Sequence, residues 1–193
     1  MRTPEDLLVF LRAQLPDPVS GQPVPEALPR FLDRHPAARA FLERLRQKPV
    51  PASYGQASYH AEHAFLFTAA DGLRRFGRYH WRPEASTRSP HFLREELERR
   101  LQAGPVVFRL LVQLAQESDP TDDVTAVWPA NQPVVELGRL EVTGISPTGA
   151  ADERRLVFDP TNLADGITLA DDPMPLARSA AYSLSYDHRS KRE

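Results

Sequence analysis

The sequence predicts an α+β fold in which short helices precede and interrupt a set of antiparallel strands. Residues 54–68 and 73–81 alternate apolar and polar side chains, as strands do, and Asp71-Gly72 between them is typical of a hairpin turn. Helical apolar spacing marks the chain on both sides of these strands. The 193 residues include 19 prolines and 9 glycines, which indicates stiff loops and short elements rather than disorder.

Helices are expected before the first strand. Thr3-Pro4 offers a suitable cap and first residue for a helix with an apolar face. Two further helices follow a turn-rich connection. They separate at His35-Pro36, because a proline disfavours helical backbone at the residue before it. The expected helices and the linker after them cover residues 3–15, 25–34, 36–47 and 48–52.

The second half of the chain is expected to alternate between helix and strand. A helix starts at Ser89-Pro90, carries its leucines on one face and ends at Gly104. The length of the chain is sufficient for one domain with a real core. The other expected elements are strands at 106–116 and 134–143, a short segment at 154–158 and a final helix from Pro173 onward.

Composition excludes several classes of function. The net charge of −2 and the pI near 6.3, without a block of lysine and arginine, argue against nucleic-acid and membrane-surface binding. The absence of cysteine excludes disulfides, thiolate nucleophiles and iron–sulfur clusters. No apolar run is long enough for a membrane span and no signal-peptide segment opens the sequence, so the cytoplasm is the expected compartment. A periplasmic location stays open if the true N-terminus lies upstream.

The C-terminal segment carries the strongest chemical pattern, Arg178-Ser-Ala-Ala-Tyr182. An arginine four residues before a tyrosine lies on the same helix face, within reach of the phenol oxygen. Its positive charge favours the phenolate, which a free tyrosine reaches only at about pH 10. An anionic oxygen of this kind suits ferric iron as a ligand. The pattern alone also fits a plain packing pair, or an ion pair of Arg178 with Asp171 or Asp172.

Several motifs, in the same order, resemble the catalases and more closely the small catalase-related peroxidases. The motifs are Arg78-Tyr-His-Trp-Arg-Pro83, Val127-Trp-Pro129, Val135-Glu-Leu-Gly-Arg-Leu140, Phe158-Asp-Pro-Thr-Asn162, Gly166-Ile167 and Asp171-Asp-Pro-Met174, followed by Arg178 and Tyr182. The resemblance runs from about Arg2 to Arg189. It implies an α+β fold, a catalase-like antiparallel β-barrel with helical excursions. This chain would supply the second half of the barrel strands and a C-terminal proximal haem helix.

The resemblance also divides the single domain and implies a site for haem b. A helical segment would cover 1–52, barrel strands with one inserted helix 53–158, and the proximal haem segment 159–193. Tyr182 would be the axial ligand of the haem iron, and Arg178 would keep its oxygen anionic. Further cofactor contacts implied by the resemblance are Arg189 toward a propionate, Phe158 and Met174 toward the porphyrin, and His63 at the porphyrin edge.

Some of these residues have a second interpretation. Phe158 and Met174 equally fit an ordinary apolar core. Tyr186 is the rival phenol near Tyr182, but the residue four positions before it is Tyr182 itself rather than an arginine. His63 lies in a predicted strand, where a histidine is more often a hydrogen-bonded structural residue than a catalytic one.

The resemblance covers only the second half of the family. The first half carries the distal histidine that takes a proton from peroxide, and none of the six histidines here lies in a motif resembling it. His63 is therefore the candidate for a substitute base. A misplaced start, a fragment of a longer chain, a partner chain that supplies the distal half and a remnant with another role all remain open explanations.

The expected function follows from the resemblance. It is the haem-dependent reduction of hydrogen peroxide or organic peroxides, with oxidation of a small organic electron donor or a second peroxide. The alternative is a non-catalytic haem-binding or interaction subunit, or a truncated remnant, that lacks the distal base. An open half-barrel exposes strand edges and apolar side chains, so a homo-oligomer or a complex with a partner chain is expected. Hydrolase and phosphate-loop motifs do not occur in the sequence.

Overall fold

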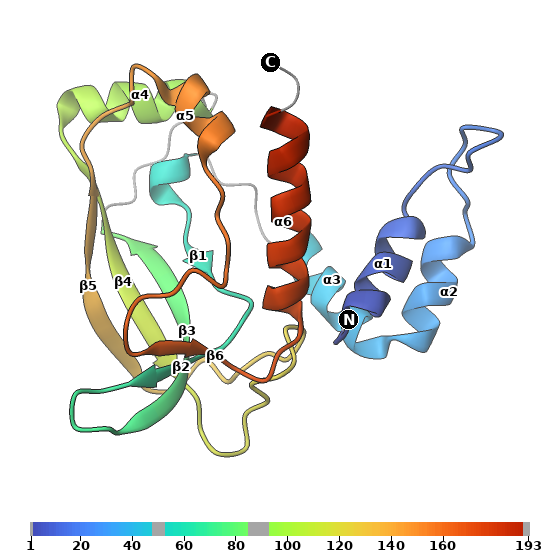
Figure 1. Cartoon of the computed structure of the whole chain (residues 1–193), viewed down its shortest axis with the longest axis horizontal. Coiled ribbons are helices and arrows are strands. Elements are labelled where there is room, and N and C mark those ends of the chain that lie inside the picture. The colour runs from blue at the N-terminus through green and yellow to red at the C-terminus, as the bar shows by residue number, and fades with distance from the viewer. Residues whose placement is uncertain (1, 48–52, 85–92, 191–193) are drawn as a thin grey trace.

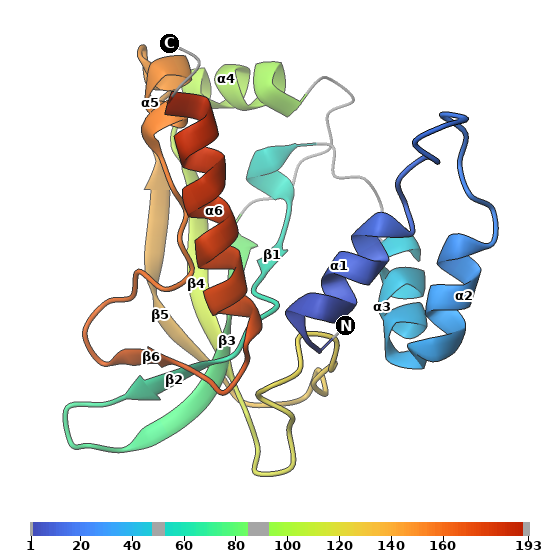
Figure 2. The ribbon, with the colours of Figure 1, turned by 45° about the vertical axis from the view of Figure 1, so that its right-hand side comes forward.

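The computed structural model describes residues 2–47, 53–84 and 93–190. Figure 1 shows one curved antiparallel sheet, with a long helix, α6 (Met174–Ser190), running alongside the strands. In Figure 1 and in the turned view of Figure 2, the three N-terminal helices form a group of their own beside the sheet. The structure therefore combines helices and an antiparallel sheet, as the sequence predicts for an α+β fold.

The N-terminal helices pack mainly on one another, and their bounds are α1 (Pro4–Arg12), α2 (Ala27–Arg34) and α3 (Pro36–Gln47). The hydroxyl oxygen of Thr3 accepts a hydrogen bond from the amide of Asp6, which caps α1 as expected. Phe31 and Ala38 form the centre of their apolar core. The break between α2 and α3 falls at His35, which confirms the expected effect of Pro36.

The sheet contains six strands, and all of its pairings are antiparallel. Five strands follow one another in the order β5-β4-β3-β2-β6, and β1 pairs with β3. The bounds are β1 (Tyr59–His60), β2 (Phe65–Thr68), β3 (Arg74–Pro83), β4 (Val106–Leu114), β5 (Val134–Val142) and β6 (Ile167–Leu169).

The hairpin between β2 and β3 confirms the expected turn. The amide of Ala69 donates to the carbonyl of Leu73, and Gly72 takes the positive φ of 85° that favours glycine. Farther along the hairpin, Gly77 of β3 lies directly beside β4. A Cβ atom on Gly77 would overlap Val112 and would lie 3.1 Å from the carbonyl oxygen of Gln113. This strand contact therefore depends on the absence of a side chain.

The structure corrects three expectations about local structure. The expectation of a single strand at 54–68 is wrong. These residues form a 3-10 turn, η1 (Tyr54–Gln56), followed by the short strands β1 and β2. Ser53 starts the turn by accepting the amide of Gly55 at 3.1 Å. A helix, α5 (Gly149–Arg155), precedes the segment expected at 154–158 and takes in its first residues. The strand β6 was not expected.

The inserted helix is confirmed as α4 (Leu93–Ala103). Its expected start at Ser89-Pro90, like the expected linker at 48–52, lies outside the described residues. Strand β5 occupies one end of the strand order and exposes apolar side chains, namely Val134, Val135, Leu137 and Leu140. In the part of the chain that the structure describes, none of the helices is long and apolar enough to cross a membrane.

Two histidines meet across β1 and β3. His60 and His80 are register partners, and their Nδ1 atoms lie in direct contact. The side-chain carbonyl of Gln113 lies 3.2 Å from Nε2 of His80. Burial lowers the pKa of His80 below its ordinary value, and the positive charges of Arg82 and Arg78 lower it further, while the bond to Gln113 opposes these effects.

This lowered pKa predicts a loss of stability in acid. The unfolded chain takes up a proton on His80 near pH 6.5, whereas the folded chain does so only at lower pH. The contribution of the neutral His80 ring to the free energy of unfolding is therefore lost as the pH falls below about 6.5. In urea unfolding, the free energy of unfolding should fall less between pH 7.5 and pH 5 for His80→Gln than for the unsubstituted protein. The exposed His188 is the control. If His188→Gln reduced the pH dependence of stability as much as His80→Gln, that dependence could not be assigned to His80.

Candidate active site

The predicted arginine–tyrosine pair forms on α6. Nη2 of Arg178 donates to the phenol oxygen of Tyr182 at 2.6 Å. The guanidinium carbon lies 5.4 Å from the centre of the tyrosine ring. One helical turn separates the two residues, so helix geometry alone brings the side chains together. A guanidinium that donates to a phenol oxygen stabilises negative charge on that oxygen.

A histidine from the segment between β1 and β2 contacts the other side of this arginine. His63, just before β2, lies with Nε2 2.8 Å from Nη1 of Arg178. An arginine side chain has only donors, so Nε2 of His63 must be the acceptor. The ring is therefore the neutral tautomer that carries its proton on Nδ1.

A carboxylate orients the histidine in turn. The Nδ1–H of His63 donates to Oδ2 of Asp172 at 2.7 Å. The other carboxylate oxygen of Asp172 accepts the amide of Met174 at 2.8 Å, at the start of α6. His63 and Asp172 are only 5% and 4% exposed. We call Asp172, His63, Arg178 and Tyr182 the tyrosine network, since each member hydrogen-bonds to the next and the series ends at the phenol oxygen.

Comparison with known proteins identifies the family of this chain. Residues 1–192 match the family model described as catalase. A catalase-related peroxidase of Mycolicibacterium paratuberculosis is 37% identical over 97% of this chain and 62% of its own length. The catalase-related peroxidase of Synechococcus elongatus is 32% identical over 98% of this chain and 59% of its own. The chain belongs to the catalase family. It spans about three fifths of the length of these two curated relatives.

Solved catalase structures confirm the predicted fold. A bacterial catalase superposes with a TM-score of 0.81 at 19% identity, over 98% of this chain and 41% of the other. Catalase A from Saccharomyces cerevisiae superposes with a TM-score of 0.76 at 18% identity, over 98% of this chain and 44% of that chain. The antiparallel sheet and helices described above are thus a catalase fold.

Of the residues that the catalase resemblance assigns to a cofactor, His63, Arg178 and Tyr182 are joined through their side chains in one hydrogen-bonded set, and Met174 is linked to it through its backbone amide, which donates to Asp172. Met174 is buried where α6 begins. Phe158 is 81% exposed.

Arg189 lies near the other end of α6. It donates to the carbonyl of Leu156 at 3.2 Å and to the hydroxyl of Ser185 at 2.9 Å. The bond to Leu156 connects the C-terminal part of α6 to the segment that carries Phe158, whereas the bond to Ser185 lies within α6. The cofactor roles of Arg189, Phe158 and Met174 stay predictions.

The role of Asp172 differs from the direct ion pair with Arg178 that its place in the sequence suggests. In the structure the two residues meet through His63 instead of directly. The signal for Asp172 was its place just before Pro173 at the start of a helix, where a carboxylate accepts a backbone amide. Its contact with a histidine 109 positions away could not be read from spacing.

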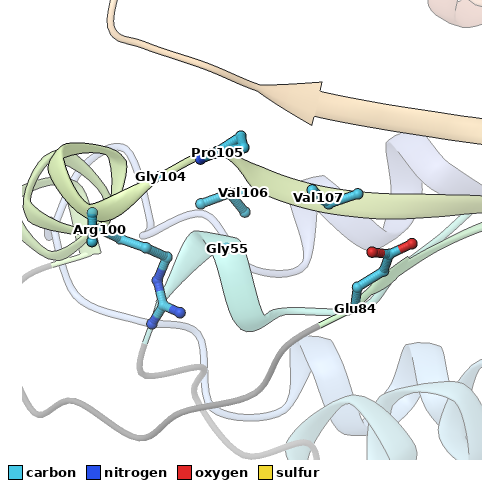
Figure 3. Close-up of a pocket in the computed structure, with 8 residues that line it drawn as sticks. Gly55, Glu84, Arg100, Gly104, Pro105, Val106 and Val107 are labelled. Atoms are coloured by element: carbon cyan, nitrogen blue, oxygen red, sulfur yellow. The ribbon is translucent and has the colours of Figure 1, made fainter.

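A hollow lies elsewhere in the molecule. It has a volume of about 410 Å³ and is formed by η1, the end of α4 and the start of β4 (Figure 3). Its charged side chains, Arg100 and Glu84, are engaged with Glu96 and Arg139 respectively. None of the residues of the tyrosine network lines it. The hollow therefore does not belong to the candidate active site.

Proposed function

We propose that this chain carries the haem-binding half of a catalase-family enzyme that reduces hydrogen peroxide or organic peroxides. The observation that carries the proposal is the 2.6 Å hydrogen bond from Arg178 to Tyr182 within a network that fixes both side chains. Catalase-related peroxidases are the relatives that this chain resembles, which supports peroxide as the substrate. A small organic electron donor, or a second peroxide, would be oxidised in the same cycle.

The residues present fit haem b as the cofactor. An oxygen that accepts from a guanidinium can stay anionic, and an anionic phenol oxygen suits ferric iron. Tyr182 would hold the iron, and Arg189 would pair with a propionate. Phe158 offers an exposed apolar ring that a porphyrin face would cover. When bound, the haem supplies the electron exchange with peroxide.

In this site, the protein's own side chains hold the positive charge of Arg178 beside the phenol oxygen of Tyr182. Asp172 fixes the proton of His63 on Nδ1, which leaves Nε2 to accept from Arg178. Arg178 is thereby held with its other amino group aimed at Tyr182. The network keeps a positive charge beside the phenol oxygen and prevents the guanidinium from turning toward water.

A second function has one observation in its favour. Both ring nitrogens of His63 are occupied, by Asp172 and by Arg178, so neither is free to take a proton from peroxide. This arrangement favours a non-catalytic haem-binding or interaction subunit. A partner chain, or a second copy, that covers the exposed side of β5 would then complete the enzyme. Peroxide turnover by the haem-loaded chain alone would exclude this alternative.

Titration with haemin tests the proposed site directly. We expect saturable binding with a tyrosinate-type absorption spectrum, and we expect Tyr182→Phe to abolish that spectrum because the iron loses its anionic ligand. Tyr186→Phe is the matched control on the next turn of α6 and should leave the spectrum unchanged. Equal effects of both substitutions would reject Tyr182 as the ligand. No saturable binding would reject the cofactor proposal for the isolated chain.

A further inference from the structure

A buried arginine outside the tyrosine network holds the loop between β4 and β5. Arg78 of β3 is only 8% exposed. Its guanidinium donates to the carbonyl oxygens of Ala126 at 2.7 Å and Asp123 at 3.1 Å. The guanidinium carbon also lies 4.4 Å from the centre of the Trp128 ring. The side chain thus binds the loop by two hydrogen bonds and one cation–π contact.

Trp128 connects this arginine to the tyrosine network. Its ring is 6% exposed and belongs to one buried apolar cluster with Ala64 and Ala170. Ala64 directly follows His63, and Ala170 lies two residues before Asp172. The indole nitrogen is fixed as well, because it donates to the carbonyl of Pro120 at 2.9 Å. The indole therefore shares one buried cluster with residues from both chain segments that present the His63–Asp172 pair.

The charge of Arg78 acts on the same pair. Burial lowers the pKa of Arg78, and the surrounding carboxylates oppose that effect, Asp123 first and Asp172 next. The guanidinium Nε is buried without a hydrogen-bond partner among the described residues. Asp172, which orients His63, is therefore one of the carboxylates whose charge acts on the Arg78 guanidinium.

We propose that Arg78 and Trp128 are positioning residues for the tyrosine network. They hold the His63–Asp172 pair in place, and the hydrogen bond between His63 and Arg178 extends this positioning to the Arg178–Tyr182 pair. The role in peroxide chemistry rests on the proposed function, whereas the positioning itself does not require haem. Neither side chain hydrogen-bonds to Tyr182, so both act through the network rather than as catalytic groups.

The test uses the proton on Nδ1 of His63 in the full chain without cofactor. A buried Nδ1–H that donates to a carboxylate exchanges slowly with water and gives a separate NMR signal, which His63→Gln identifies by its loss. In Arg78→Met we expect this proton to exchange at least about tenfold faster, because the pair opens more often. In Arg78→Lys, which keeps the charge but loses the two-carbonyl fork, we expect an intermediate rate.

The matched control is Arg75→Met, because Arg75 is an exposed arginine of the same strand. This variant should leave the His63 signal unchanged. A folded Arg78→Met protein with an unchanged exchange rate would overturn the proposal. If Arg78→Met does not fold, Arg78→Lys decides: faster exchange supports positioning and an unchanged rate refutes it. Failure of haemin binding would reject the cofactor proposal while leaving this result intact.

Discussion

The substitution Gly77→Ala is expected to lower the free energy of unfolding by about 2 kcal/mol. Gly77 is buried in β3, and a Cβ there would overlap Val112 and approach Phe67 to 3.2 Å and the Gln113 carbonyl oxygen to 3.1 Å. The carbonyl belongs to the paired backbone of β4 and cannot move without breaking the ladder. The gain from a less flexible unfolded chain, about 0.4–1 kcal/mol, is too small to offset this overlap.

The control for this substitution lies in the same sheet. Around Gly138 of β5, no atom beyond the glycine and its two chain neighbours lies within 4 Å of the place where a Cβ would lie. Gly138→Ala should therefore leave the free energy of unfolding within about 0.5 kcal/mol of the original. Urea denaturation of both variants measures the difference. If Gly77→Ala proved as mild as Gly138→Ala, the close packing of β3 against β4 would be incorrect.

Removal of the Asp172 carboxylate should cost about 3 kcal/mol. Asp172→Ala leaves two buried donors without an acceptor, the amide of Met174 and Nδ1 of His63, and each such loss costs about 1–3 kcal/mol. The same change frees the His63 ring to rotate, which removes the acceptor from Arg178. Denaturant unfolding gives the stability, and the loss of the His63 Nδ1–H signal reports the broken pair.

Asp171 is the natural control, because it is the preceding aspartate in the sequence and is exposed. Asp171→Ala should change the free energy of unfolding by no more than about 0.5 kcal/mol. A cost for Asp171→Ala equal to that of Asp172→Ala would mean that the segment contributes through its backbone rather than through the carboxylate of Asp172.

The sequence was sufficient where local rules determine the structure. The cap at Thr3, the helix break at Pro36 and the turn at Gly72 each depend on a few neighbouring residues, and all three are present. The pair of Arg178 and Tyr182 was likewise predictable, because four residues of helix fix its geometry. These predictions needed no knowledge of how distant segments pack.

The sequence was insufficient where distant segments decide the structure. Strand β6 has three residues, too few for alternation to register, and exists because it pairs with β2. Helix α5, which was not expected, forms where Asp152 accepts hydrogen bonds from the hydroxyls of Ser146 and Thr148. The hydrogen bond between His63 and Asp172 and the cation–π contact between Arg78 and Trp128 both depend on the folded sheet, which brings these distant residues together.

The anchoring of α6 is uneven along its length, and this affects how the helix opens. Met174 and Pro175 are buried and Asp172 accepts the first amide, whereas Leu184 and the residues near Ser190 are exposed. Local unfolding of the helix is therefore expected to begin at its C-terminal end, where few contacts are buried and the hydrogen bond from Arg189 to Leu156 is exposed to water. Tyr182 lies between these two regions. The hydrogen bond between Arg178 and His63 holds the helical turn that carries Tyr182 in place while the last turns of α6 unfold locally. The Arg178–Tyr182 pair is therefore expected to persist when the C-terminal end of the helix opens.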